Sequence, residues 1–141
     1  MSDSITGGCR CGAIRYECQA EPVGTVSCSC EDCKIFYRGV MAAAVILPRA
    51  AVNISGDPVY FEVVGGSGMP VARGFCAKCG TQLFGKPDIA AQLMSVTAGS
   101  LDDHQDFKPQ MHVYTGNAYP WLQLAEDITR FEAMPERIPE I

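Results

Sequence analysis

The sequence lacks what several large functional classes require. Its 141 residues include only two histidines, too few to argue for a Ser–His–Asp arrangement. Basic residues are outnumbered by acidic ones, 11 to 16, and the net charge is −5. This balance argues against a general nucleic-acid binder and against a polybasic membrane-surface protein. The longest uncharged apolar run, residues 40–47, is far too short to span a bilayer.

An export signal is also missing, because residues 1–6 contain neither a basic segment nor an apolar one. We therefore expect a cytoplasmic protein whose thiols are kept reduced. Cysteine is the residue type that stands out, with eight copies. In a reducing compartment, metal binding is the leading explanation for them, and a disulfide framework is the weaker alternative.

The composition predicts one globular domain covering residues 1–141, because 48% of residues are hydrophobic and 19% charged. No repeat or linker divides the chain. Many short segments bounded by glycine and proline predict a mainly β sandwich or barrel-like domain. We expect strands at residues 13–20, 41–47, 51–55, Val59–Val64, 92–98 and 110–115, and a hairpin over 73–84. Short helices are expected at Glu31–Tyr37 and 125–133, and a turn at 65–68.

Two groups of cysteines predict a closed structural zinc site. The segment Cys-Ala-Lys-Cys-Gly begins at Cys76, and its spacing lets the sulfurs of Cys76 and Cys79 reach one ion. The glycine that follows permits the tight turn. Cys9 and Cys11, each beside a glycine, are the natural second pair. Four thiolates would complete the site and tie the N-terminus to the middle of the chain.

The remaining group, Cys28, Cys30 and Cys33, offers three thiolates from one short segment. Three protein ligands leave a fourth position open, as in catalytic or substrate-binding zinc sites. The alternative is a structural site completed by Cys18, Asp32 or another chain. Iron–sulfur ligation is a further alternative for both groups, because spacing alone does not exclude it.

Other candidate residues have a structural interpretation. Cys18 alternates with Ile14 and Tyr16 along a period-two pattern, so we expect a buried, inert thiol. His112 lies in a strand-like stretch, and a buried histidine with satisfied hydrogen bonds is favoured over a role near the metal. Lys34 and Arg38 lie close in sequence to the three-cysteine group and are candidates for binding an anionic substrate, or are ordinary surface cations.

The sequence resembles the glutathione-dependent formaldehyde-activating enzyme family, also called the centromere-protein-V-like family. Five blocks in the same order carry the resemblance, and the match runs from residue 7 to about 134, which leaves 135–141 as a tail. The blocks are GGCRCGAIRY (7–16), CSCEDC (28–33), RGFCAKCGTQLF (73–84), GSLDD (99–103) and HVYTGNAYPWL (112–122).

This resemblance implies a zinc-pinned fold of the Mss4-like type with two zinc ions per chain. It implies a structural zinc on the first and third cysteine groups and a catalytic zinc on the second. It also implies a carbon–sulfur lyase activity that joins glutathione to formaldehyde, giving S-hydroxymethylglutathione. The expected partners are therefore a small thiol and a small aldehyde, without nucleic acid or membrane.

The second block departs from the family pattern. Ser29 stands where the family usually has histidine, and the glycine that usually follows closely comes one residue late, at Gly39. These changes keep all three sulfurs but alter the surroundings of a substrate. They favour a non-catalytic zinc-binding or thiol-binding module as the alternative. Zinc storage or redox sensing through the three cysteines is a third hypothesis.

Overall fold

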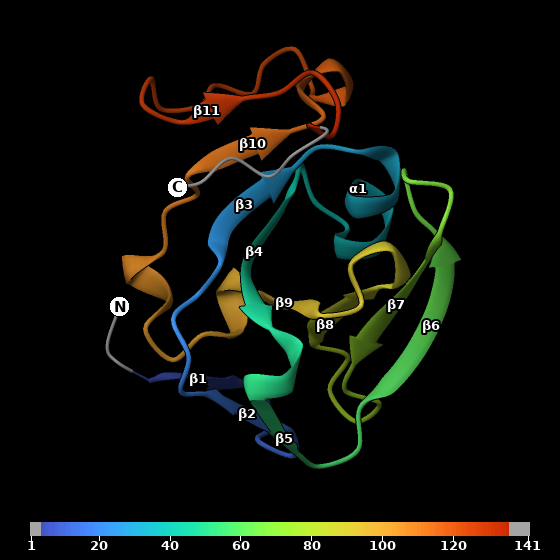
Figure 1. Cartoon of the computed structure of the whole chain (residues 1–141), viewed down its shortest axis with the longest axis vertical. Helices are drawn as coiled ribbons and strands as arrows, with labels where there is room; N and C mark the ends of the chain where they lie inside the picture. Colours follow the sequence, from blue (N-terminus) through green and yellow to red (C-terminus); the bar gives the residue numbers. More distant parts are fainter. Residues whose placement is uncertain (1–3, 136–141) are drawn as a thin grey trace.

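The computed structural model describes residues 4–135, so most of the expected tail, 135–141, lies outside the described residues. Two β-sheets form the molecule (Figure 1). The smaller has the order β1-β2-β5 and the larger the order β11-β10-β3-β4-β9-β8-β7-β6. Their bounds are β1 Ile5–Gly8, β2 Arg15–Cys18, β3 Gly24–Cys28, β4 Ala42–Pro48, β5 Val52–Ser55, β6 Val59–Val64, β7 Pro70–Phe75, β8 Gln82–Pro87, β9 Leu93–Thr97, β10 Met111–Val113 and β11 Thr129–Arg130.

One α-helix, α1 (Glu31–Tyr37), and five short 3₁₀ turns complete the described chain. The turns are η1 Arg49–Ala51, η2 Asp88–Ala90, η3 Ala98–Ser100, η4 His104–Asp106 and η5 Thr115–Asn117. Helix α1 has the predicted bounds, and no helix among residues 4–135 is long and apolar enough to cross a membrane. The mainly β, single-domain prediction is confirmed.

The core lies where the small sheet packs on the middle of the large one. Strand β2 alternates buried and exposed residues, as expected, and Cys18 is buried with Tyr16 in this core. Their partners come from β4, β8 and β9, which contribute buried residues such as Leu47, Phe84 and Val96. The Tyr16 and Phe84 rings meet edge to face. This packing fixes the framework from which both cysteine groups project.

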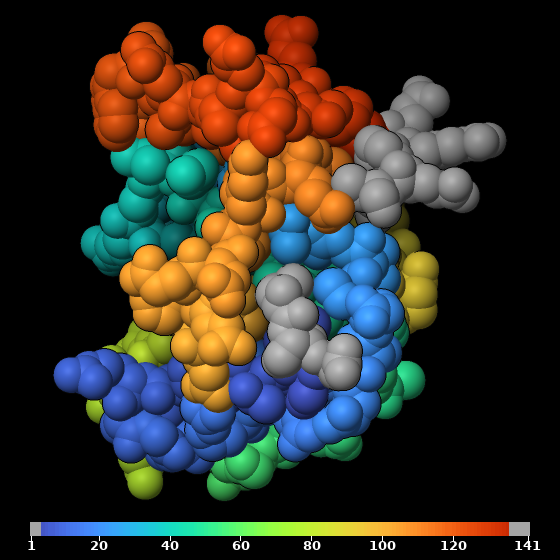
Figure 2. All heavy atoms as spheres, turned by 90° about the vertical axis from the view of Figure 1, so that its left-hand side faces the viewer, coloured from blue at the N-terminus to red at the C-terminus, as the bar shows by residue number. Residues whose placement is uncertain are grey.

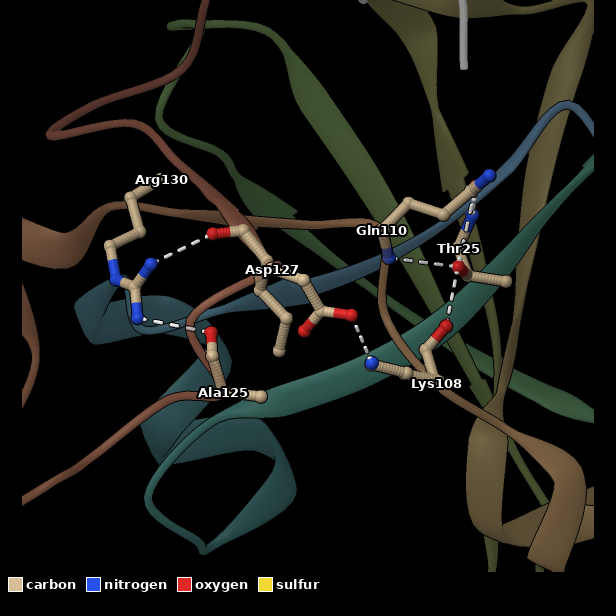
Figure 3. A network of polar contacts seen from close by, with 7 residues as sticks. Thr25, Lys108, Gln110, Ala125, Asp127 and Arg130 are labelled. Carbon is tan, nitrogen blue, oxygen red and sulfur yellow. Dashed lines mark hydrogen bonds and ion pairs between the residues drawn. The ribbon is translucent and has the colours of Figure 1, made fainter.

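The predicted helix over 125–133 is wrong. The C-terminal segment instead forms a layer over one end of the molecule (Figures 1 and 2), and β11 pairs in parallel with β10. Arg130 donates to the carbonyls of Leu124, Ala125 and Ile128, while Lys108 pairs with Asp127 (Figure 3). These bonds occupy carbonyls that a helix would use, and Ile128 is the buried apolar anchor of this stretch rather than one of a helical stripe.

Candidate metal centres

The first cysteine cluster joins two turns that are distant in sequence. Cys9 and Cys11 lie in the β1–β2 connection, whereas Cys76 and Cys79 lie at the tip of the β7–β8 hairpin. All four sulfur atoms lie within 4.8 Å of one another. The Sγ–Sγ distances are 3.6 Å for Cys9–Cys11 and 3.8 Å for Cys11–Cys76. Tetrahedral zinc with Zn–S bonds of about 2.3 Å places its sulfurs about 3.8 Å apart, so this donor set fits zinc.

The two turns of this cluster are built alike. Gly12 donates to the carbonyl of Cys9, and Gly80 donates to the carbonyl of Cys76. Both glycines have positive φ, 80° and 77°, a conformation that costs other residues energy. Each turn therefore curls its two sulfurs toward one point. The cysteines are free thiols, so no disulfide accounts for the approach.

Neighbouring donors favour anionic sulfur at two positions of this cluster, Cys9 and Cys79. Ile14 donates its backbone N–H to the Cys9 sulfur at 3.2 Å. The hydroxyl of Thr81 lies 3.2 Å from the Cys79 sulfur and accepts from the N–H of Arg10. The Thr81 hydroxyl and backbone N–H lower the pKa of Cys79 to about 5. A metal ligand must lose its proton, and these contacts favour that loss.

The second cluster lies at the junction of β3 and α1. Cys28 ends β3, Cys30 is the N-cap of α1, and Cys33 is the buried residue of the helix. Their sulfurs lie within 4.8 Å of one another. Among residues 4–135, no histidine, aspartate, glutamate or further cysteine joins this set. Three thiol donors with no fourth protein ligand fit an open zinc site.

Two of the alternative fourth ligands, Cys18 and Asp32, are engaged with other residues of the chain. Cys18 is fully buried in the core. Asp32 forms an ion pair with Arg73 at 2.5 Å. Within the described part of the chain, the structure therefore offers the second cluster as a three-sulfur site.

The three sulfurs of this cluster shift one another's pKa values. The thiols of Cys28 and Cys33 hold the pKa of Cys30 down, to about 2. The bond to Cys30 in turn raises the pKa of Cys28.

His112 supports this cluster from behind. It is fully buried, and its Nδ1 and Nε2 meet the hydroxyls of Ser27 and Ser29 at 2.5 and 2.7 Å. The interpretation of His112 as a satisfied structural histidine is confirmed. Ser29, the departure from the family pattern, is itself fully buried and faces this imidazole. Its hydroxyl is therefore part of the scaffold rather than of a substrate surface.

The two candidate cations near this cluster have different settings. Lys34 is engaged by the chain: its Nζ donates to the carbonyl of Asn117 at 2.7 Å, pairs with Glu31 and lies over the Tyr119 ring. It thereby ties α1 to the segment after β10. Arg38 is exposed at the C-cap of α1 in a left-handed conformation, with φ of 53°. Arg38 is thus the member of the pair that faces solvent.

Sequence reasoning assigned no role to Arg73. This residue of β7 is only 8% exposed, and its Nη2 lies 3.9 Å from the Cys33 sulfur. The contact is hard to predict from sequence, because 40 residues separate Arg73 from Cys33 and only the packing of β7 near α1 brings them together. A charged residue directly before Gly-Phe-Cys76, inside an apolar hairpin, was the available hint.

Comparison with known proteins places these features in a family context. Residues 4–117 match the family model described as glutathione-dependent formaldehyde-activating enzyme. A crystal structure of a Rhodobacter sphaeroides protein is similar with a TM-score of 0.56 and 18% identity, covering 70% of this chain and 88% of the other. At that identity the likeness concerns the fold. No curated protein sequence matches the chain.

Proposed function

The chain belongs to the glutathione-dependent formaldehyde-activating enzyme family, and from this membership we propose that it joins a small thiol to a small aldehyde. The proposed pair is glutathione and formaldehyde, with S-hydroxymethylglutathione as product. The observation that carries the proposal is the set of three sulfurs on β3 and α1 without a fourth protein ligand among the described residues.

The proposed reaction needs no oxidant and no leaving group. A lone pair of the thiol sulfur forms the carbon–sulfur bond, and the carbonyl π electrons move to oxygen. That oxygen takes up the proton that the thiol lost, so one thiol and one aldehyde give one hydroxymethyl adduct. The protein's contribution would be to favour the ionised form of the thiol and to hold it in the correct orientation against the neutral aldehyde.

Zinc is the cofactor we propose for both clusters, two ions per chain. Cys9, Cys11, Cys76 and Cys79 would hold the structural ion, and Cys28, Cys30 and Cys33 the second. A zinc ion at three thiolates supplies a further position at which a substrate thiol binds as thiolate near neutral pH.

The cations near the second cluster support the proposal that it binds an anionic thiol. Glutathione is an anion at pH 7, and the chain itself carries −5, so binding requires local cations. Arg38 is exposed at the end of α1, and Arg73 is buried beside the Cys33 sulfur. All eight cysteines are free thiols, which suits a reducing compartment, and we propose the cytoplasm.

The test is acceleration of adduct formation above the spontaneous rate. Zinc-loaded protein would be added to glutathione and ¹³C-formaldehyde, and exchange between free aldehyde and adduct would be followed by NMR. We expect the wild-type protein to accelerate the exchange and Cys33→Ser to lose the acceleration. Cys18→Ala is the matched control, since it removes a thiol that belongs to neither cluster, and it should keep the acceleration.

Metal counting by native mass spectrometry accompanies this measurement. We expect two zinc ions in the wild-type protein and one in Cys33→Ser. A wild-type protein that holds two zinc ions but leaves the exchange at its spontaneous rate would overturn the enzymatic proposal. The non-catalytic thiol-binding alternative would then account for the open site.

A further inference from the structure

Among the residues that the structure describes, each sulfur of the second cluster has one N–H donor. The backbone N–H of Cys30 points to the Cys28 sulfur at 3.4 Å, and that of Cys33 points to the Cys30 sulfur at 3.3 Å. The Cys33 sulfur is approached by Arg73 Nη2 at 3.9 Å. The first two donors come with the local backbone of the β3–α1 turn. The third donor is a side chain of β7, which reaches the Cys33 sulfur only through the tertiary packing of the chain.

The surroundings of Arg73 make particular contacts with its guanidinium, but burying this charge there costs free energy. Its guanidinium forms an ion pair with Asp32 and lies 5.3 Å from the Phe36 ring centroid and 5.9 Å from that of Tyr37. Both rings belong to α1, within cation–π range. The Nε atom is buried without a hydrogen-bond partner among the described residues. Burying a charge with one donor unpaired is unfavourable, so such a group usually has a role.

The net charge of the second cluster with zinc bound indicates what Arg73 would do there. Three thiolates and one zinc ion sum to −1, and a bound substrate thiolate would make the sum −2. Arg73 supplies a positive charge at the Cys33 sulfur from a side chain that is 10% exposed. Its partner Asp32 is 28% exposed, so water screens the carboxylate more than it screens the guanidinium.

We infer that Arg73 is a positioning residue of the second cluster, which orients the Cys33 sulfur and offsets the negative charge of a thiolate-rich metal site. This inference rests on the proposed function, because it assigns the residue that lets the same site accept an anionic thiol. Hydrogen bonds to ligating atoms orient the ligands and tune the metal they hold. Arg73 does this through Cys33 and does not touch the reacting atoms.

The test measures metal binding without glutathione or formaldehyde. Wild-type, Arg73→Gln and Arg73→Lys proteins would be titrated with a chelator, and zinc per chain would be counted by native mass spectrometry. In Arg73→Gln we expect the second zinc to bind about 10–100-fold more weakly, the usual effect of removing an outer-shell partner. Arg73→Lys keeps the charge but lacks the planar fork, so it should fall between. Retention of the first zinc shows that each variant is folded.

Arg49→Gln is the matched control. Arg49 is half-buried and, like Arg73, has one buried nitrogen without a hydrogen-bond partner in the described part of the chain. Its Nε donates to the Leu93 carbonyl. Arg49 follows the end of β4 opposite to Ala42, the residue that pairs with Cys28. It should keep wild-type affinity for both ions. Cobalt substitution adds a spectroscopic readout, because the sulfur-to-cobalt absorption band should shift in Arg73→Gln and not in Arg49→Gln.

The outcomes separate this inference from the proposed function. Wild-type affinity and an unchanged cobalt spectrum in Arg73→Gln would overturn the role of Arg73, even if the protein accelerates the reaction. Weaker binding of the second metal in Arg73→Gln, with no acceleration by the wild-type protein, would support the role of Arg73 and overturn the enzymatic proposal. A wild-type protein that holds only one metal ion would overturn both.

Discussion

His112 illustrates how a single residue can fix the geometry of a site that it does not enter. Its ring is fully buried behind the second cluster, and its two nitrogens meet Ser27 and Ser29 on either side of Cys28. Ser29 further receives support through its N–H, which donates to the carbonyl of Val113. The segment that carries the first two sulfurs is thereby bound to β10 by side chain and backbone alike.

The first prediction at this scale concerns His112 and pH. Burial, and then the charge of Arg130, lower the pKa of His112. A lowered pKa means that the folded state resists protonation, so the stabilising contribution of the neutral ring is present above the unfolded pKa of about 6.5. It is lost as the pH falls from there through the lower pKa of the folded state.

We therefore expect His112→Gln to be less stable than the wild-type protein at pH 7.5, by about 1–3 kcal/mol, because a serine hydroxyl loses its partner. The stability gap between the two proteins should narrow as the pH is lowered below 6.5. Urea unfolding across pH 5–7.5 measures this gap, and the comparison cancels the acid sensitivity of the thiolate sites common to both. His104→Gln, which alters an exposed histidine, should show no gap. A gap for His112→Gln that is constant with pH would contradict the prediction.

At the scale of elements, the turn between β6 and β7 packs against the segment that follows β10. The predicted turn at 65–68 is confirmed: Gly68 donates to the Gly65 carbonyl. A β-carbon on Gly66 would overlap the hydroxyl of Tyr114. Burial and the negative charge of Cys30 raise the pKa of Tyr114. The β6–β7 turn and Tyr114 are therefore in direct contact.

This contact predicts how two substitutions, alone and combined, change the stability of the protein. Gly66→Ala should destabilise the protein by about 1–3 kcal/mol, because the added methyl group forces Tyr114 from its place. Tyr114→Phe removes the overlapping hydroxyl, so the double variant should recover a large part of the loss, and thermal unfolding would measure this coupling. Gly99→Ala is the control, because a β-carbon there meets no atom within 4 Å. If Gly66→Ala lowers stability equally in the wild-type and the Tyr114→Phe proteins, the contact with the tyrosine hydroxyl is not the cause of the loss.

At the scale of the whole molecule, the sequence predicted what depends on local pattern. Strand β6 and helix α1 were predicted with the bounds that the structure has, and the hairpin tip with Cys76 and Cys79 was also expected. The grouping of sulfurs followed from spacing and glycine turns. The zinc itself stays a prediction.

What the sequence did not reveal depends on long-range pairing. Strands β1 and β3 were missed: β1 is glycine-rich, and β3 has two polar residues on its buried side. The C-terminal segment has helix-forming residues but is held by Arg130 and by parallel pairing with β10. Arg73 reaches Cys33 only because the large sheet places β7 beside α1. No pattern within a short window contains that information.

Loss of a ligand from the first cluster should reduce stability more than any other change predicted here, because this cluster connects the two sheets. Cys9 and Cys11 follow β1 of the small sheet, while Cys76 and Cys79 join β7 to β8 of the large one. Structural zinc contributes roughly 10–16 kcal/mol in small zinc-finger peptides, and a whole domain has a stability of only about 5–15 kcal/mol. Even a fraction of the free energy contributed by structural zinc is therefore comparable to the whole free energy of unfolding of a domain.

We therefore expect Cys79→Ser to be largely unfolded, or to melt well below the wild-type protein. Cys33→Ser should lose one zinc ion and keep its cooperative unfolding, because the second cluster lies within one β3–α1 connection and does not link the sheets. Differential scanning calorimetry with zinc analysis of the same samples measures both. Excess chelator should reproduce the two steps in order, releasing the zinc of the open cluster first and unfolding the protein as the other leaves. Cys79→Ser protein with wild-type melting would show that packing between the sheets suffices without the metal, and the first cluster would then have no structural role.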